Sequence, residues 1–149
     1  MGKRRNAREV ALQFLYQLDL GDEADPAPHE PEFWTRHRLD ADAQVFARHL
    51  VHGTKSNQAQ IDELIAQSAE HWGLDRMSVV DRNILRVAVF ELACQPNVPP
   101  KVAINEAIEI AKKFGTRDSA RFINGILDRV HKELHPSATD QAGPASHVS

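Results

Sequence analysis

The stretch from Val79 to Cys94 limits the possible folds more than any other part of the chain, because it is apolar nearly all round a helix. A helix without a wide polar face has to be surrounded by other elements, so we expect this one at the centre of the protein. Ser78 and Asp81 form a capping signal at its start. A narrow exposed strip must hold its few polar residues, which are Asp81, Arg82, Asn83, Arg86 and Glu91.

Four further segments carry apolar residues at the three- and four-residue spacing of amphipathic helices. They begin near Ala7, at the cap residue Asp40, after the prolines that follow Cys94, and near Asp118. Within the second of them, Gly53 indicates a close helix contact or a kink. No alternating strand pattern is long enough to defend, and 149 residues fit one domain. The sequence therefore predicts an all-α protein.

The two ends of the chain differ from this helical part. Asn6 followed by Glu9 resembles a capping box for the first helix. Residues 1–6 would then form a flexible basic arm, and residues 7–135 the helical domain. Residues 136–149 are mostly small and polar, which predicts a disordered tail.

Positive charge is concentrated at the beginning of the chain, in Lys3, Arg4, Arg5 and Arg8. Because these residues contribute +4 and the whole chain sums to -3, the rest of the chain carries -7. Cations at a helix N-terminus each lose a few tenths of a kcal/mol to about 1 kcal/mol, since the helix dipole is positive there. An anionic partner such as RNA would supply the missing favourable energy. A solvated start that aids solubility is the alternative interpretation.

Nothing in the sequence indicates catalytic or metal chemistry. His49 with His52, and His131 with His135, have the spacing of two metal ligands on one helix, but no carboxylate or cysteine completes either set. We find no phosphate-binding glycine loop, no nucleophile motif and no distinctive carboxylate pair. We therefore expect no enzyme, no cofactor and no metal site. The chain has a single cysteine, Cys94, and we recognise no signal peptide, so we expect a protein of the reducing cytoplasm. We also find no apolar run long enough to span a membrane.

Several side chains are candidates for contacting unpaired bases. Phe122 fits either core packing or stacking on a base at the rim of the last helix. Asp118 is either an N-cap or, with Ser119, a contact to base edges or sugar hydroxyls. Tyr16 falls off the main apolar stripe of the first helix, which predicts a surface ring beside the basic residues. Arg86 and Arg82 lie one helical turn apart, so their charges repel each other slightly unless an acidic neighbour or a partner neutralises them.

Short sequence blocks follow one another in order from the basic segment to about Leu134. They include Ala7-Arg8-Glu9, Val80-Asp81-Arg82-Asn83-Ile84-Leu85-Arg86, Val102-Ala103-Ile104-Asn105-Glu106-Ala107 and Phe122-Ile123-Asn124-Gly125. The most specific parts are Ile104-Asn105-Glu106-Ala107 and Asn124-Gly125. In these blocks the chain resembles the NusB family of bacterial transcription antitermination factors. The resemblance implies two packed helical bundles and no catalytic activity. It also implies binding to the boxA element of ribosomal RNA operon transcripts jointly with NusE, a small-subunit ribosomal protein.

The resemblance further implies roles for particular residues. The expected RNA-binding residues are Lys3, Arg4, Arg5 and Arg8 in the arm, together with Tyr16, Arg86, Asp118, Ser119 and Phe122. Contact with NusE is expected to begin at Asp81 and Arg82. The factor would act in the transcription elongation complex, with RNA polymerase and other Nus factors. The alternative hypothesis is a helical protein-interaction module or a homodimer, whose basic arm binds an acidic partner.

Overall fold

The structure is a computed structural model that describes residues 2–70 and 72–136, and all its regular elements there are helical, as the sequence predicts. The predicted tail from residue 137 onward lies outside the described residues. Two short 3-10 turns, Ala27–His29 and Leu74–Arg76, precede α2 and α5. The helices are α1 (Lys3–Leu20), α2 (Glu30–Arg36), α3 (Ala41–Ser56), α4 (Gln58–Ala69), α5 (Val79–Cys94), α6 (Pro100–Phe114) and α7 (Ser119–Leu134).

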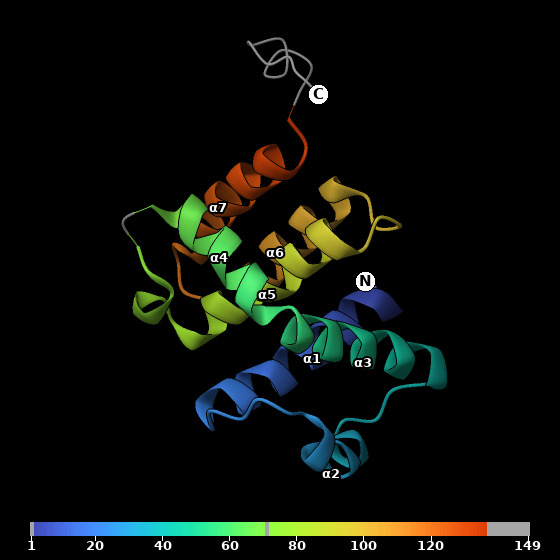
Figure 1. The fold of residues 1–149 in the computed structure, drawn as a ribbon. Helices are drawn as coiled ribbons and strands as arrows, with labels where there is room; N and C mark the ends of the chain where they lie inside the picture. Colours follow the sequence, from blue (N-terminus) through green and yellow to red (C-terminus); the bar gives the residue numbers. More distant parts are fainter. Residues whose placement is uncertain (1, 71, 137–149) are drawn as a thin grey trace.

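The helices form two groups that share α5 (Figure 1). Helices α1, α2 and α3 lie together on one side, and α4, α6 and α7 lie on the other. Helix α5 packs against α1 and α3 as well as against α4, α6 and α7. All residues from Asn83 to Leu92 are buried, so the predicted central helix is confirmed. Within the described ranges, no helix combines the length and apolarity that a membrane span requires.

The narrow exposed strip predicted for the central helix is wrong, because most of its polar residues are buried. The Asn83 amide donates to Asp19 Oδ2 at 2.9 Å. Arg86 donates to Asp62 of α4 at 2.8 Å and to Asp19 at 3.2 Å. These carboxylates, which come from α1 and α4, give the buried donors the partners that burial requires.

Two of the predicted helix caps are confirmed. Asp40 accepts a hydrogen bond from the Ala43 backbone at 2.9 Å, and Ser78 accepts one from the Asp81 backbone at 3.0 Å. Each satisfies a backbone N–H that the first turn of a helix leaves free. The long segment after Asp40 is divided in two, since α3 ends at Ser56 and α4 begins at Gln58.

The predicted start of the first helix near Ala7 is wrong. Helix α1 begins at Lys3, and the Asn6 backbone N–H already bonds to the Gly2 carbonyl at 3.2 Å. A capping box at Asn6 is therefore not formed. Arg5 and Arg8 form ion pairs with carboxylates from α6 and α5. These contacts stabilise the first turns of α1 as a helix, although the local sequence predicts that the helix begins later.

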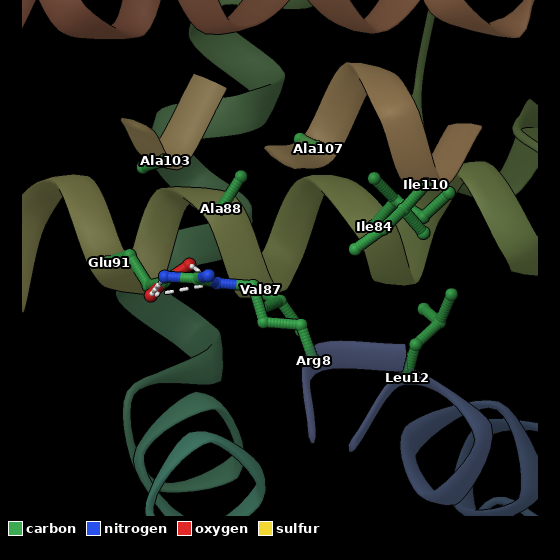
Figure 2. A pocket seen from close by; sticks show the side chains of 9 residues that line it. All are labelled: Arg8, Leu12, Ile84, Val87, Ala88, Glu91, Ala103, Ala107 and Ile110. Atoms are coloured by element: carbon green, nitrogen blue, oxygen red, sulfur yellow. Dashed lines mark hydrogen bonds and ion pairs between the residues drawn. The ribbon is translucent and has the colours of Figure 1, made fainter. Parts of the chain in front are cut away.

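A buried ion pair joins α1 to α5 (Figure 2). The Arg8 guanidinium donates from Nη2 to Glu91 Oε2 at 2.8 Å and from Nε to Oε1 at 3.0 Å. Only 4 % of Arg8 and 1 % of Glu91 is exposed. Beside the pair, Ala103 and Ala107 of α6 line a cavity of about 20 Å³, enough for one water molecule. The pair fixes α1 lengthwise against the central helix.

Gly53 lets α3 approach α5 closely, as its place in the sequence suggested. A Cβ added at Gly53 would lie 2.1 Å from the Phe90 ring. Phe90 is itself 2 % exposed, so the ring has little room to move away. The contact therefore requires glycine because of space, and not because of backbone conformation.

We predict that Arg8→Ala lowers the free energy of unfolding by about 3–5 kcal/mol, because it leaves the Glu91 carboxylate buried without its cation. Arg4→Ala, at an exposed position on the same helix, should lower it by less than about 1 kcal/mol. Urea unfolding of both variants measures the difference. Equal losses would show that the pair does not hold α1 in place.

Gly53→Ala is expected to destabilise the protein by about 1–3 kcal/mol, since the methyl group overlaps the buried Phe90 ring. Gly125→Ala on α7 is the matched control, because its Cβ would meet nothing closer than the Arg129 side chain at 4.0 Å. That control should gain about 0.5–1 kcal/mol from helix propensity. Thermal unfolding that moved both variants in the same direction would contradict this account.

Candidate nucleic-acid interface

Three of the four predicted cations lie at the surface on the first turn of α1, and we call Lys3, Arg4 and Arg5 the basic first turn. Lys3 and Arg4 are exposed, and Arg5 is half-buried. Lys3 Nζ lies 2.9 Å from Asp40 Oδ2, and the Arg4 guanidinium lies 4.3 Å from the centroid of the Phe46 ring. These contacts gather the three cations at one end of α1, where a phosphate backbone can reach them.

A carboxylate from α6 partly neutralises the basic first turn. Arg5 donates to Glu106 from Nε and from Nη2, the second bond being 2.8 Å long. This hydrogen bonding lowers the pKa of Glu106 and raises the pKa of Arg5. The hydrogen bond to Asp40 likewise raises the pKa of Lys3. The carboxylates explain how a helix start tolerates these cations, and a bound phosphate must compete with them.

One face of α1 connects the basic first turn to Tyr16. Arg5, Glu9, Gln13 and Tyr16 follow one another at helical spacing, so they share that face over about 16 Å. Lys113 of α6 donates to Glu9 at 2.9 Å and places another cation along the way. Tyr16 is 38 % exposed, which confirms its predicted place at the surface.

The far end of this face opens into a cavity of about 410 Å³, which we call the Tyr16 hollow. Its lining includes Tyr16 and Gln13 of α1, together with Val80 of α5 and Phe114 of α6. His37, which directly follows α2, also lines it. Phe114 is 38 % exposed, the same fraction as Tyr16. Two aromatic side chains with open surface thus border one cavity.

A second cavity of about 360 Å³, the Phe122 hollow, lies between the starts of α5 and α7. Its lining includes Phe122, Asp118, Asp81, Trp72 and Arg76. Both hollows reach the first turn of α5, since Val80 lines the Tyr16 hollow and Asp81 lines the Phe122 hollow. We therefore treat the basic first turn, the tyrosine, and the predicted residues of the last helix as one candidate surface.

Three predicted RNA-binding residues are buried in this structure against partners of their own. Arg8 is held by Glu91, and Arg86, which is 7 % exposed, is held by carboxylates from α1 and α4. Ser119 is 1 % exposed and accepts a hydrogen bond from the Thr116 backbone at 2.8 Å. All three have a structural role within the fold, and their contact with RNA stays a prediction.

The residues expected to meet a partner protein have mixed exposure. Asp81 is half-buried and lines the Phe122 hollow. Arg82 donates to Asp19 at 2.9 Å and to the Leu74 carbonyl at 3.1 Å, so it also stabilises the fold. Asp118 stands at the N-cap position of α7 without a capping hydrogen bond from its side chain. The N-cap interpretation of Asp118 is wrong in that respect, and its carboxylate stays exposed.

Sequence reasoning missed three residues of this surface. Trp72 and Phe114 fit the apolar spacing of the helices before them, yet they are 46 % and 38 % exposed. Each lies where a helix stops: α4 ends at Ala69 before the tryptophan, and Phe114 is the last residue of α6. Glu106 was noted only as part of a sequence block, because its contact with Arg5 spans 101 residues.

The paired histidines do not assemble a metal centre. His49 hydrogen-bonds to the Gln95 side chain at 2.9 Å, and His52 lies 3.1 Å from Glu30. The rings of His131 and His135 are 5.3 Å apart between centroids. In the part of the chain that the structure describes, no three side chains of ligand type form a group that could hold a metal ion.

Comparisons with known proteins agree with this architecture. The model of the NusB family matches residues 5–132. The transcription antitermination protein NusB of Myxococcus xanthus is 48 % identical over 139 residues, which cover 91 % of this chain and 99 % of that protein. A NusB structure from T. maritima has a TM-score of 0.80 at 41 % identity, covering 91 % of this chain and 94 % of that one.

A further solved structure holds the antitermination factors NusB and NusE in complex with dsRNA. It has a TM-score of 0.80 at 28 % identity and covers 89 % of this chain and 98 % of that one. The family model spans most of the chain, and the relative from Myxococcus xanthus is similar along nearly its whole length. This chain belongs to the NusB family of transcription antitermination factors.

Proposed function

We propose that this chain binds the boxA element of ribosomal RNA operon transcripts together with NusE, as an antitermination factor without catalytic activity of its own. One observation carries the proposal: α1 runs from surface cations at its start to the Tyr16 hollow, and the first turn of α5 lines both that hollow and the Phe122 hollow. The solved complex of NusB and NusE with dsRNA, which is similar in fold, supports the same class of ligand.

The two parts of the surface suit different parts of an RNA strand. Lys3, Arg4 and Arg5 offer positive charge to phosphates, which gives attraction without sequence choice. Tyr16 and Phe122 offer ring faces on which unpaired bases stack. Since the formal charge of the whole chain is -3, attraction to RNA has to come from this local group of cations. A single-stranded element is the ligand that uses both parts.

NusE is proposed to bind where Asp81 and Arg82 lie, at the start of α5. The Phe122 hollow begins at Asp81, so the protein partner and the RNA would meet there. The complete assembly would include RNA polymerase and other Nus factors in the cytoplasm. A homodimer, the alternative that the sequence leaves open, stays a prediction.

We expect the double variant Arg4→Ala and Arg5→Ala to bind boxA RNA more weakly and with a shallower salt dependence. Each phosphate neutralised on a single strand contributes about -0.7 to the slope of log K against log salt concentration. Three cations give a slope near -2, so losing two should leave it near -0.7. Fluorescence anisotropy with labelled boxA RNA, with and without NusE, measures both quantities between 50 and 200 mM salt.

Lys132→Ala serves as the control, because Lys132 is an exposed cation near the end of α7 whose partner is Asp128, 3.3 Å away. This variant should keep the affinity and the slope of the unchanged protein. If the double variant Arg4→Ala and Arg5→Ala had the same affinity and salt slope as the Lys132→Ala control, the role of the basic first turn would be overturned. Failure of the unchanged protein to bind boxA RNA, alone or with NusE, would overturn the proposed function.

A further inference from the structure

We propose that Trp72 and Phe122 form the two stacking walls of a pocket that receives one unpaired RNA base. The inference rests on the proposed function and deepens it, since it assigns a role to a tryptophan that neither the sequence motifs nor the buried core explains. The pocket is the Phe122 hollow, whose volume of about 360 Å³ is within the usual range for sites that bind small molecules.

Trp72 is held at the rim of this hollow and not in the core. It is 46 % exposed, and its backbone N–H donates to the Ala69 carbonyl at 3.1 Å. The Arg76 guanidinium lies 5.9 Å from the centroid of the Trp72 rings. A large flat ring left half in water loses the free energy that burial gives elsewhere in the chain. A ligand that covers the ring would recover it.

Beside the Arg76 guanidinium, the hollow offers two carboxylates that accept hydrogen bonds. Asp81 Oδ1 is buried and finds no donor among the described residues. Asp118 adds a second, exposed carboxylate. A buried acceptor without a partner is unfavourable, so this site favours a ligand that brings an N–H group. Two carboxylates against the single guanidinium of Arg76 leave the lining with a net negative charge, which favours a base over a phosphate as the occupant of this hollow.

A nucleobase meets these requirements together. It has a flat face for the rings of Trp72 and Phe122, and its edge carries the N–H donors that Asp81 and Asp118 lack. The phosphates on either side of such a base would lie outside the hollow, toward the cations along α1 and α6. A side chain of NusE is the competing occupant, because Asp81 also belongs to the surface proposed for NusE.

The experiment uses the fact that the chain has two tryptophans. Trp34 lies on α2 and is not among the residues that line the hollow, so Trp34→Phe leaves Trp72 as the single fluorescent reporter. Titration of this variant with boxA RNA should quench its emission, because a base stacked on indole quenches it. Binding measured by anisotropy with an unchanged Trp72 emission would overturn the inference while leaving the proposed function intact.

A second measurement compares affinities. Trp72→Ala should weaken boxA binding about ten-fold, and Trp72→Phe, which keeps an aromatic face, should restore most of the loss. Val45→Ala removes another exposed apolar side chain, 69 % exposed on α3, and should change nothing. Calorimetry with NusE alone should give equal affinities for Trp72→Ala and the unchanged protein. A loss of NusE affinity with unchanged RNA affinity would make a NusE side chain the occupant and overturn the base pocket.

Discussion

The buried ion pair between Arg8 and Glu91 is the contact on which the rest of this structure depends. It ties α1, from the group of helices at the beginning of the chain, to the central helix that both groups share. Burying two charges is expensive, and such a pair contributes more to a defined arrangement than to net stability. Because the pair fixes α1 along its length, it also fixes where the basic first turn and Tyr16 lie.

This arrangement divides the basic residues by task. Arg8 serves the fold, whereas Lys3, Arg4 and Arg5 remain at the surface with carboxylate or aromatic neighbours. Since Arg5 already donates hydrogen bonds to Glu106, an RNA phosphate would have to replace that carboxylate. The net binding free energy would be only the difference between the two interactions. Under the proposed function, charge attraction from the helix start would therefore be modest, and the aromatic hollows would have to provide much of the affinity and all of the base choice.

The sequence could predict those features of the fold that depend on patterns within one segment of the chain. The helices, the caps at Asp40 and Ser78, and the central place of α5 all follow from spacing within one segment. The ion pairs that bury two of the arginines could not be predicted, because they join distant parts of the chain: Arg8 meets a residue 83 positions away, and Arg86 meets one 67 positions away. Trp72 fits the apolar spacing of the helix before it, although that helix ends at Ala69. The family resemblance located the candidate surface, but the exposure of each residue required the structure.

The central claim is that one surface joins the basic first turn to both hollows, and an NMR titration of the isotope-labelled protein with boxA RNA tests it most directly. Chemical shifts should change for Lys3 to Arg5, for Tyr16, and for the lining of the Tyr16 and Phe122 hollows. The outer face of α3 around Val45 and His49, where another shallow cavity lies, should stay unchanged. Shift changes centred on that face of α3, with the two hollows silent, would contradict the account.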